Sequence, residues 1–275
     1  YQSTILPICK FLYNINNPQI LEIGIDAGQS AIPLISNLLR AGDRFTYTGI
    51  EILPPHESKK SDHFIQQIIQ MDGANLIDVD VDNPAEANVR PLYEDSLKIL
   101  PELVKLNCKY DLILIDGDHN YETVSKELSY IDDLSYPSTI VVLDDYSGRH
   151  KGKDMFYGER NSHSGFKDSI AKRSGTASGG MGVTGAVDDF LRSSEGKWSI
   201  YQTRAEVTDS KGQKKQILTD YVFLIQTQYI PDFRVIPGLR YSKSYELIEA
   251  TLSPSALGRF KPDFVNTLWE KLNSQ

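Results

Sequence analysis

The feature of this chain that most restricts its fold is an alternation of short apolar segments with longer amphipathic ones from Gln19 to Asp145. The apolar segments are rich in β-branched residues, as buried parallel strands are, and the longer ones carry apolar residues at helical spacing. We expect strands at Gln19–Ile23, Phe45–Glu51, Asn88–Tyr93, Tyr110–Ile115 and Thr139–Leu143. We expect helices at Ser30–Arg40, Ser58–Met71, Ser96–Leu106 and Tyr121–Ile131. This order predicts an α/β fold, a doubly wound and mostly parallel sheet with helices on both faces.

The pattern changes after these units. Ser147–Gly180 is dense in Gly, Ser, Lys and Arg and lacks a clean period, which indicates a lid-like insertion at about 147–180. A helix at Val183–Arg192 and two strands joined by a polar turn at Asp209–Gly212 are expected next, with the strands at Trp198–Thr203 and Tyr221–Gln226. From Pro231 the chain mixes prolines with two expected helices, Tyr245–Leu252 and Pro262–Leu272. We interpret residues 1–275 as one domain with a C-terminal extension at about 230–275.

Composition excludes several partners. The net charge of −8 and the pI near 5.2 disfavour nucleic acid and anionic membrane surfaces. No apolar run approaches the roughly 20 residues that span a bilayer, and no signal peptide is visible. Cys9 and Cys108 form no metal-binding pattern and are expected to be small core residues, so we expect a cytoplasmic protein. Because the chain opens at Tyr1, we expect either a trimmed chain or a domain cut from a longer protein, and both alternatives stay open, as does a homo-oligomer.

The first polar motif lies where the segment Gln19–Ile23 ends. Glu22, Gly24 and Gly28 form an ExGxxxG pattern before the helix expected from Ser30. Glycines here permit a tight turn and let the backbone approach a ligand closely, beside the amides of a helix N-terminus. Such a turn also occurs as a plain structural corner, so the pattern alone does not establish a ligand.

Acidic residues lie at the end of the next expected strand, Phe45–Glu51, and just after the one that follows it, Asn88–Tyr93. Glu51 is placed to accept hydrogen bonds from both hydroxyls of a ribose, although a solvated strand end is the other interpretation. The closely spaced glycines that accommodate a pyrophosphate are missing, so a ligand without phosphates fits better than a nicotinamide cofactor. Asp95 and Ser96 either cap the following helix or bind an adenine, and both roles are compatible.

Three further aspartates follow two neighbouring apolar segments. Asp116 directly follows Tyr110–Ile115, and Asp144 and Asp145 directly follow Thr139–Leu143. Carboxylates crowded at one place repel each other unless a cation neutralises them, and oxygen ligands favour Mg²⁺, Mn²⁺ or Ca²⁺ over zinc. The sequence therefore predicts a divalent metal site, with Mg²⁺ or Mn²⁺ preferred. A helix cap or a solvated position stays open for Asp118 and Asp145.

His119 lies three residues beyond Asp116, on the loop that leads into the next helix. A histidine with its ordinary pKa near 6.5 is suited to accept a hydroxyl proton at neutral pH. The position between the expected metal ligands favours a general base over a surface imidazole. His56, His63, His150 and His163 have no such setting, although the last two fall in the expected lid.

Together these motifs resemble the class I S-adenosylmethionine-dependent methyltransferases, and within them the metal-dependent O-methyltransferases related to the macrocin and mycinamicin sugar O-methyltransferases. The matching segments are LEIGIDAGQS, TGIEI, YEDSLKILPEL, YDLILIDGDHNYETVSKEL, IVVLDDY and GVTGAVDDFL, between about Gln19 and Arg192. The resemblance implies a Rossmann-like sheet of seven strands with the last one antiparallel.

The resemblance also implies roles for individual residues. It places Glu22, Gly24 and Gly28 at the methionine part of the cofactor, Glu51 at the ribose, and Asp95 with Ser96 at the adenine. Ser30 and Asp116 are expected at the cofactor as well. The implied metal ligands are Asp116, Asp144 and Asp145, with His119 as general base.

From this we expect a metal-assisted methyl transfer from S-adenosylmethionine to a hydroxyl of a small polyhydroxylated acceptor, such as a sugar, a catechol-like aromatic or a polyketide-derived compound of natural product biosynthesis. Two alternatives stay open. One is a metal-free methyltransferase whose aspartates only shape the acceptor site. The other is a cofactor-binding domain of a larger synthase that has lost catalysis.

Overall fold

The computed structural model describes residues 8–9, 11–42, 44–76, 87–147, 151–154, 181–208 and 214–227. Its strands are β1 (Gln19–Ile23), β2 (Phe45–Glu51), β3 (Ala74–Leu76), β4 (Ala87–Tyr93), β5 (Tyr110–Ile115), β6 (Ser135–Leu143), β7 (Trp198–Thr208) and β8 (Lys214–Gln226). Its helices are α2 (Ala31–Arg40), α3 (Lys59–Ile69), α4 (Ser96–Lys105), α5 (Tyr121–Ser129), α6 (Ile131–Leu134) and α10 (Gly182–Ser193).

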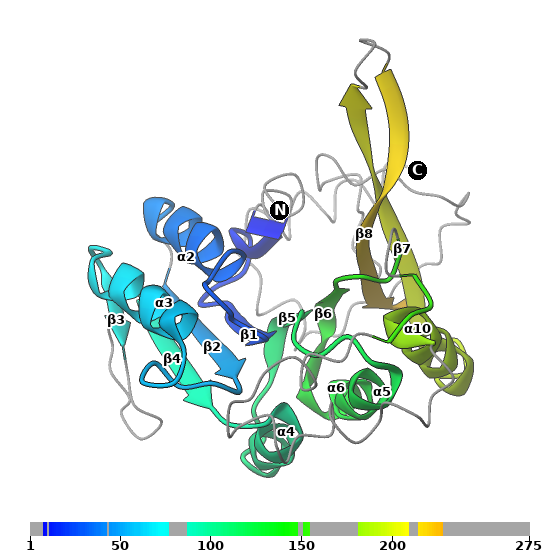
Figure 1. Ribbon diagram of the computed structural model, residues 1–275, viewed down its shortest axis with the longest axis horizontal. Helices are drawn as coiled ribbons and strands as arrows, with labels where there is room; N and C mark the ends of the chain where they lie inside the picture. The colour runs from blue at the N-terminus through cyan, green and yellow to red at the C-terminus, as the bar shows by residue number, and fades with distance from the viewer. Residues whose placement is uncertain are drawn as a thin grey trace.

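The described strands form one sheet in the order β3-β4-β2-β1-β5-β6-β8-β7. All neighbours from β3 to β6 pair in parallel, whereas β8 pairs antiparallel with both β6 and β7. The sequence order reverses direction beside β1, and α/β sheets bind ligands at such a point, beyond the carboxyl ends of the strands. The hairpin of β7 and β8 extends well past the rest of the sheet (Figure 1).

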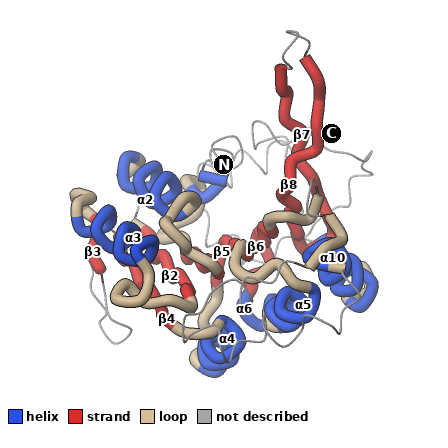
Figure 2. Tube along the Cα trace, in the orientation of Figure 1, coloured by secondary structure: helices blue, strands red, loops and turns tan. Residues whose placement is uncertain are grey.

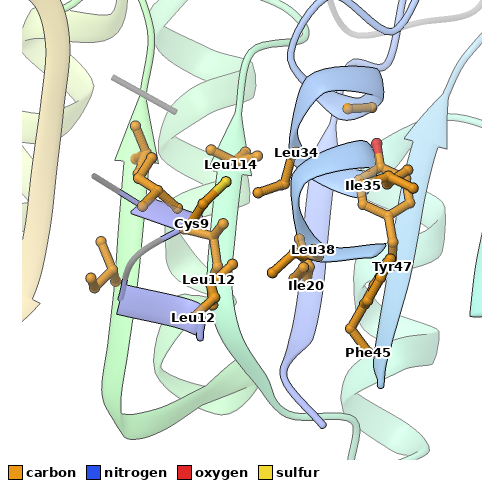
Figure 3. Packing of buried hydrophobic residues seen from close by; sticks show 14 of the residues in the cluster. Cys9, Leu12, Ile20, Leu34, Ile35, Leu38, Phe45, Tyr47, Leu112 and Leu114 are labelled. Carbon is orange, nitrogen blue, oxygen red and sulfur yellow. The ribbon is translucent and has the colours of Figure 1, made fainter. Parts of the chain in front are cut away.

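Helices cover both faces of the sheet (Figure 2). On one face α2 and α3 pack on the sheet, because α2 places Ala31, Leu34, Ile35 and Leu38 at helical spacing on its buried side. Figure 3 shows this layer, in which α2 lies over β1 and β2 and Cys9 contributes to the same core. The opposite face is covered by α4, α5, α6 and α10.

The structure confirms the predicted α/β fold with its antiparallel last strand and adds one strand to the seven expected. The extra strand, β3, has only three residues and no alternating pattern, so nothing in the sequence marked it. β6 begins at Ser135, four residues before the predicted Thr139. The prediction missed these first residues because Pro137 lies among them and is unfavourable within a strand. The helix expected to continue to Ile131 ends at Ser129, and α6 follows separately.

Some expectations fall outside the described residues. These are most of the lid-like insertion, the turn at Asp209–Gly212, and the C-terminal extension with its two expected helices. None of the helices in the described ranges is long and apolar enough to cross a membrane.

Candidate active site

The carboxyl ends of β2, β1, β5 and β6 are joined at one edge of the sheet by backbone hydrogen bonds. The amide of Gly24 donates to the carbonyl of Ile50 (2.8 Å), and the amide of Asp116 donates to the carbonyl of Ile23 (2.8 Å). The amide of Asp144 donates in turn to the carbonyl of Ile115 (3.1 Å). The acidic residues that follow these strands are therefore brought side by side, as their sequence positions predicted.

Gly24 is required where the turn after β1 meets the loop after β5. Its φ is +89°, and a Cβ at this position would lie 2.4 Å from the carbonyl oxygen of Asp116. Any other residue would strain the backbone and collide with that loop. Gly28 also has a positive φ (+78°), and a Cβ there would meet Phe64 and Ile32 at less than 3 Å. These two glycines therefore hold the turn close against its neighbours.

Glu22 is completely buried beneath this turn. One carboxylate oxygen accepts a hydrogen bond from the hydroxyl of Ser30, and the other accepts one from the hydroxyl of Tyr47 at 2.8 Å. Burial raises the pKa of Glu22 to about 8, although both hydrogen bonds act in the opposite direction. The carboxylate of Glu22 thus fastens β1 to β2 and to the start of α2.

Glu51 lies at the end of β2, beside the same turn. Its Oε2 accepts a hydrogen bond from the amide of Asp26 (2.8 Å), and its Oε1 accepts from the amides of Ile52 (3.0 Å) and Leu53 (3.3 Å). Burial nevertheless raises the pKa of the Glu51 carboxyl above its ordinary value. These backbone donors fix the direction of the carboxylate, and each oxygen retains acceptor capacity for a ribose hydroxyl.

Asp95 and Ser96 start α4 close to this edge. Asp95 caps the helix, because its Oδ1 accepts a hydrogen bond from the amide of Leu97 at 2.9 Å. The hydroxyl of Ser96 donates to Oε1 of Glu127 on α5 at 2.6 Å. Burial raises the pKa of Glu127 to about 8. The capping role expected for Asp95 is confirmed, and Ser96 is held by a carboxyl group that the sequence had not suggested.

The three aspartates Asp116, Asp144 and Asp145 gather beyond β5 and β6, where Ile115 pairs with Leu143. Burial and the negative charges of Asp116 and Asp145 raise the pKa of Asp144 above its usual range. Asp145 adopts a left-handed backbone (φ +55°), which an aspartate tolerates better than most residues. The three carboxyl groups therefore lie close to one another beyond the two strands.

His119 lies between two of these carboxylates. Its Nδ1 is 2.8 Å from Oδ2 of Asp145, and its Nε2 is 3.4 Å from Oδ1 of Asp116. Burial disfavours the charged ring, but the hydrogen bonds and charges of Asp116 and Asp145 outweigh it and raise the pKa of His119 to about 10. These two carboxylates therefore favour the charged form of the ring over the neutral form that a general base requires.

The loop that carries His119 is fastened by neighbouring polar groups. Oδ2 of Asp118 accepts a hydrogen bond from the hydroxyl of Thr123 (2.6 Å) and another from Asn120. The amide of Tyr121 donates to Oδ1 of Asp154 at 2.8 Å. Asp118 therefore secures the loop to the first turn of α5, which is a structural role of the kind left open for it.

No preassembled metal site is present within the described ranges. Among these residues, no group of three or more His, Cys, Asp or Glu side chains is arranged to hold a metal ion. Asp116 and Asp145 are directed at the ring of His119, so the predicted ligand set is close together without converging on a common point.

Comparison with known protein families relates the part of the chain that forms this edge of the sheet to one family. Residues 21–146 match the model of a family described as a methyltransferase domain. This part of the chain is a methyltransferase domain. The matched residues run from β1 to the end of β6, and the domain therefore includes the glycine turn, Glu51 and all three aspartates. The predicted class I S-adenosylmethionine-dependent methyltransferase is thereby confirmed for this part of the chain.

Solved structures similar to the methyltransferase domain and its C-terminal strands include an O-methyltransferase from Bacillus cereus in complex with SAH. It is 18% identical, with 82% of this chain and 80% of that chain covered and a TM-score of 0.46. The O-methyltransferase TomG from Streptomyces achromogenes, involved in tomaymycin synthesis and in complex with SAM, is 17% identical, with coverages of 82% and 79% and a TM-score of 0.46.

A third similar structure is the MycE methyltransferase of the mycinamycin pathway in complex with Mg, SAH and mycinamycin VI. It is 12% identical, with 78% of this chain and 46% of that chain covered and a TM-score of 0.38. Likeness at this level does not assign a substrate or a metal to this chain. No curated protein sequence matches this chain.

Two residues of the methyltransferase domain were missed at the sequence level. Tyr47 occupies an apolar strand and reads there as an ordinary core residue, so nothing in its context signals a hydrogen bond to Glu22. Glu127 carried a signal that could have been used. It lies on the buried face of α5 with Val124 and Leu128, where an acidic side chain needs a partner.

Proposed function

We propose that this protein transfers the methyl group of S-adenosylmethionine to a hydroxyl oxygen of a small polyhydroxylated acceptor. The observation that carries the proposal is the arrangement at the strand ends. The glycine turn is bonded to Glu51 through Asp26 and lies against Asp116 through Gly24, and Asp116 in turn contacts His119. A nucleoside-type donor and an ionisable acceptor site would thus share one edge of the sheet.

The donor would occupy the turn after β1. Gly24 and Gly28 let the backbone approach the methionine part, next to Glu22 and Ser30, while the fixed carboxylate of Glu51 would accept the two ribose hydroxyls. Asp95 and Ser96 would border the adenine. When bound, the cofactor supplies an electrophilic methyl group attached to a positively charged sulfur. The carboxylates along this edge favour that charge.

A divalent cation would be held by Asp116, Asp144 and Asp145. The chemistry of these donors fits Mg²⁺ or Mn²⁺, because three carboxylates share a confined region and the pKa of Asp144 is raised by burial and by its neighbours. Such a cation would lower the pKa of the acceptor hydroxyl. The acceptor class that suits this chemistry carries two adjacent oxygens, as in a sugar, a catechol or a polyketide-derived diol.

The proton of the acceptor hydroxyl would pass to His119. Transfer of the methyl group to the acceptor oxygen would release a proton, which needs a base within hydrogen-bonding reach. Asp145 contacts Nδ1 of the ring, and Nε2 lies beside Asp116. A cation bound to the two aspartates would compensate their negative charge and favour the neutral ring, and Nε2 would then receive the proton. Holding donor and acceptor in line can contribute roughly 7 to 11 kcal/mol to catalysis.

A metal-free methyltransferase is the second candidate, and one observation favours it. Asp116 and Asp145 already face the cationic ring of His119, and the described residues contain no preassembled metal site. In that case the aspartates would hold the ring in place and shape the acceptor site.

One experiment separates these candidates. The protein is freed of metal with EDTA and incubated with S-adenosylmethionine carrying a radioactive methyl group and a panel of catechols and sugars. Transfer that requires added Mg²⁺ or Mn²⁺ supports the first candidate, and equal transfer with EDTA supports the second. If S-adenosylhomocysteine binds but no acceptor is methylated, the third possibility, a domain without catalysis, is favoured.

A further inference from the structure

The side chain of Tyr47 connects the middle of β2 to the glycine turn in two ways. Tyr47 is fully buried and pairs with Ile20 of β1 in the parallel sheet. Figure 3 shows it between β2 and α2, next to Ile35. Nothing in the packing of the described core requires a hydroxyl at this position, since phenylalanine would fill the same space.

The first connection runs through the hydroxyl of Tyr47. It donates to Oε2 of Glu22 at 2.8 Å, and the other oxygen of Glu22 accepts from the hydroxyl of Ser30. Ser30 lies just before α2, yet its side chain makes no capping hydrogen bond with that helix. The hydroxyl of Ser30 is directed at Glu22 instead, so this chain of hydrogen bonds ends at the last residue of the turn.

The second connection runs through the ring of Tyr47. Its centroid lies 6.3 Å from that of Phe64 on α3. Phe64 in turn lies against Gly28, where an added Cβ would be 2.7 Å from its Cδ2. The ring of Tyr47 therefore supports the turn at Gly28, while its hydroxyl supports the turn at Ser30.

We propose that Tyr47 is a positioning residue for the cofactor-binding turn and that it acts through the carboxylate of Glu22. The inference rests on the proposed function, because it assigns the turn to S-adenosylmethionine. Glu22 is completely buried, and its two oxygens accept hydrogen bonds from the hydroxyls of Tyr47 and Ser30. Its contribution to cofactor binding is therefore the shape of the turn rather than a direct contact.

The test compares the Tyr47→Phe variant with the natural protein by titrating each with S-adenosylhomocysteine in a calorimeter. Loss of the hydroxyl leaves one oxygen of the buried carboxyl group of Glu22 without its donor, so the turn should relax and the Kd should rise by about tenfold. In the methyl-transfer assay, KM for S-adenosylmethionine should rise by a similar factor, with kcat and the acceptor KM nearly unchanged. A purely structural role would lower the thermal stability without this selective loss.

Two further variants make the result decisive. Tyr110→Phe removes a hydroxyl from another buried tyrosine, at the start of β5 and thus at the amino-terminal end of that strand, and it should leave the Kd unchanged. In a Glu22→Gln background, Tyr47→Phe should raise the Kd by less than about threefold, since the carboxyl group through which Tyr47 acts is then already absent.

The outcomes distinguish this inference from the proposed function. If the natural protein binds S-adenosylhomocysteine and Tyr47→Phe binds it equally well, the positioning role is wrong while the proposed function stands. The positioning role is also wrong if Tyr47→Phe raises the Kd as much in the Glu22→Gln background as alone. If the natural protein does not bind S-adenosylhomocysteine at all, the proposed function fails first. Circular dichroism confirms that each variant is folded before titration.

Discussion

Nδ1 of His119 lies 2.8 Å from Oδ2 of Asp145, so a residue after β5 is tied to a residue after β6 at the centre of the candidate site. Because Nε2 of the same ring faces Asp116, one imidazole separates two carboxylates. In the proposed function the ring would accept a proton from the acceptor once a bound cation balances the charge of the two carboxylates.

Replacing this ring should reduce catalysis far more than cofactor binding. We expect His119→Ala to lower kcat by about 10²- to 10⁴-fold, which is the usual contribution of a general base. The Kd for S-adenosylhomocysteine should stay close to that of the natural protein. His63→Ala, on the exposed side of α3, serves as the control. An unchanged pH–rate profile in His119→Ala would reject the assignment of the base.

Asp144 tests the metal in the proposed mechanism. Asp144→Ala should abolish methyl transfer and remove the binding of Mn²⁺ in a calorimetric titration, because one of the three carboxylate ligands is lost. Binding of S-adenosylhomocysteine should largely survive. Asp133→Ala, an exposed substitution on α6, should change neither property. If Asp144→Ala retains full activity, or if EDTA leaves the natural protein fully active, the metal has no part in the reaction.

Gly24 and Gly42 form a matched pair for testing the close approach of the loops. Both have positive φ, but a Cβ at Gly42 would meet nothing within 4 Å, whereas one at Gly24 would collide with the backbone of Asp116. Gly42→Ala should cost only the backbone strain, about 1 to 2 kcal/mol of unfolding free energy. Gly24→Ala should cost several kcal/mol and abolish S-adenosylhomocysteine binding. Equal urea-denaturation midpoints for the two variants would contradict the geometry of the turn.

Glu127 should make stability depend on pH. Burial raises the pKa of Glu127 from 4.5 to about 8, so the folded protein favours its protonated form. Its contribution to stability is therefore fully present below about pH 4.5 and is lost as the pH rises through about 8.

Glu127→Gln keeps an acceptor for the hydroxyl of Ser96 but cannot ionise. The variant should be more stable than the natural protein at pH 9, by about 1 kcal/mol or more, and the difference should shrink toward pH 5. Urea denaturation of both proteins at the two pH values measures this. A difference that does not change with pH would show that Glu127 is not the titrating group.

The sequence was sufficient to predict the central sheet and the neighbourhood of the aspartates. Tyr110–Ile115 is a continuous apolar strand, and Asp116 directly follows it, so the position of that carboxylate at the sheet edge follows from strand order alone. The glycine turn was recognisable for the same reason.

What the sequence could not supply were contacts between side chains far apart in the chain. The approach of Gly24 to the backbone of Asp116 depends on how two loops pack, and so does the placement of His119 between Asp116 and Asp145. The sequence suggested direct cofactor contacts for Glu22 and Ser30, whereas the structure joins them to each other and to Tyr47. Sequence spacing also could not distinguish a converging metal site from carboxylates divided by a histidine.

Asp154 joins two helices that lie far apart in the chain. One of its oxygens accepts hydrogen bonds from the amides of both Tyr121 and Gly182, at 2.8 and 3.0 Å. The starts of α5 and α10 are thus joined at a single atom. Loss of this one carboxylate would release both helix starts together, including the first turn that directly follows the loop of His119.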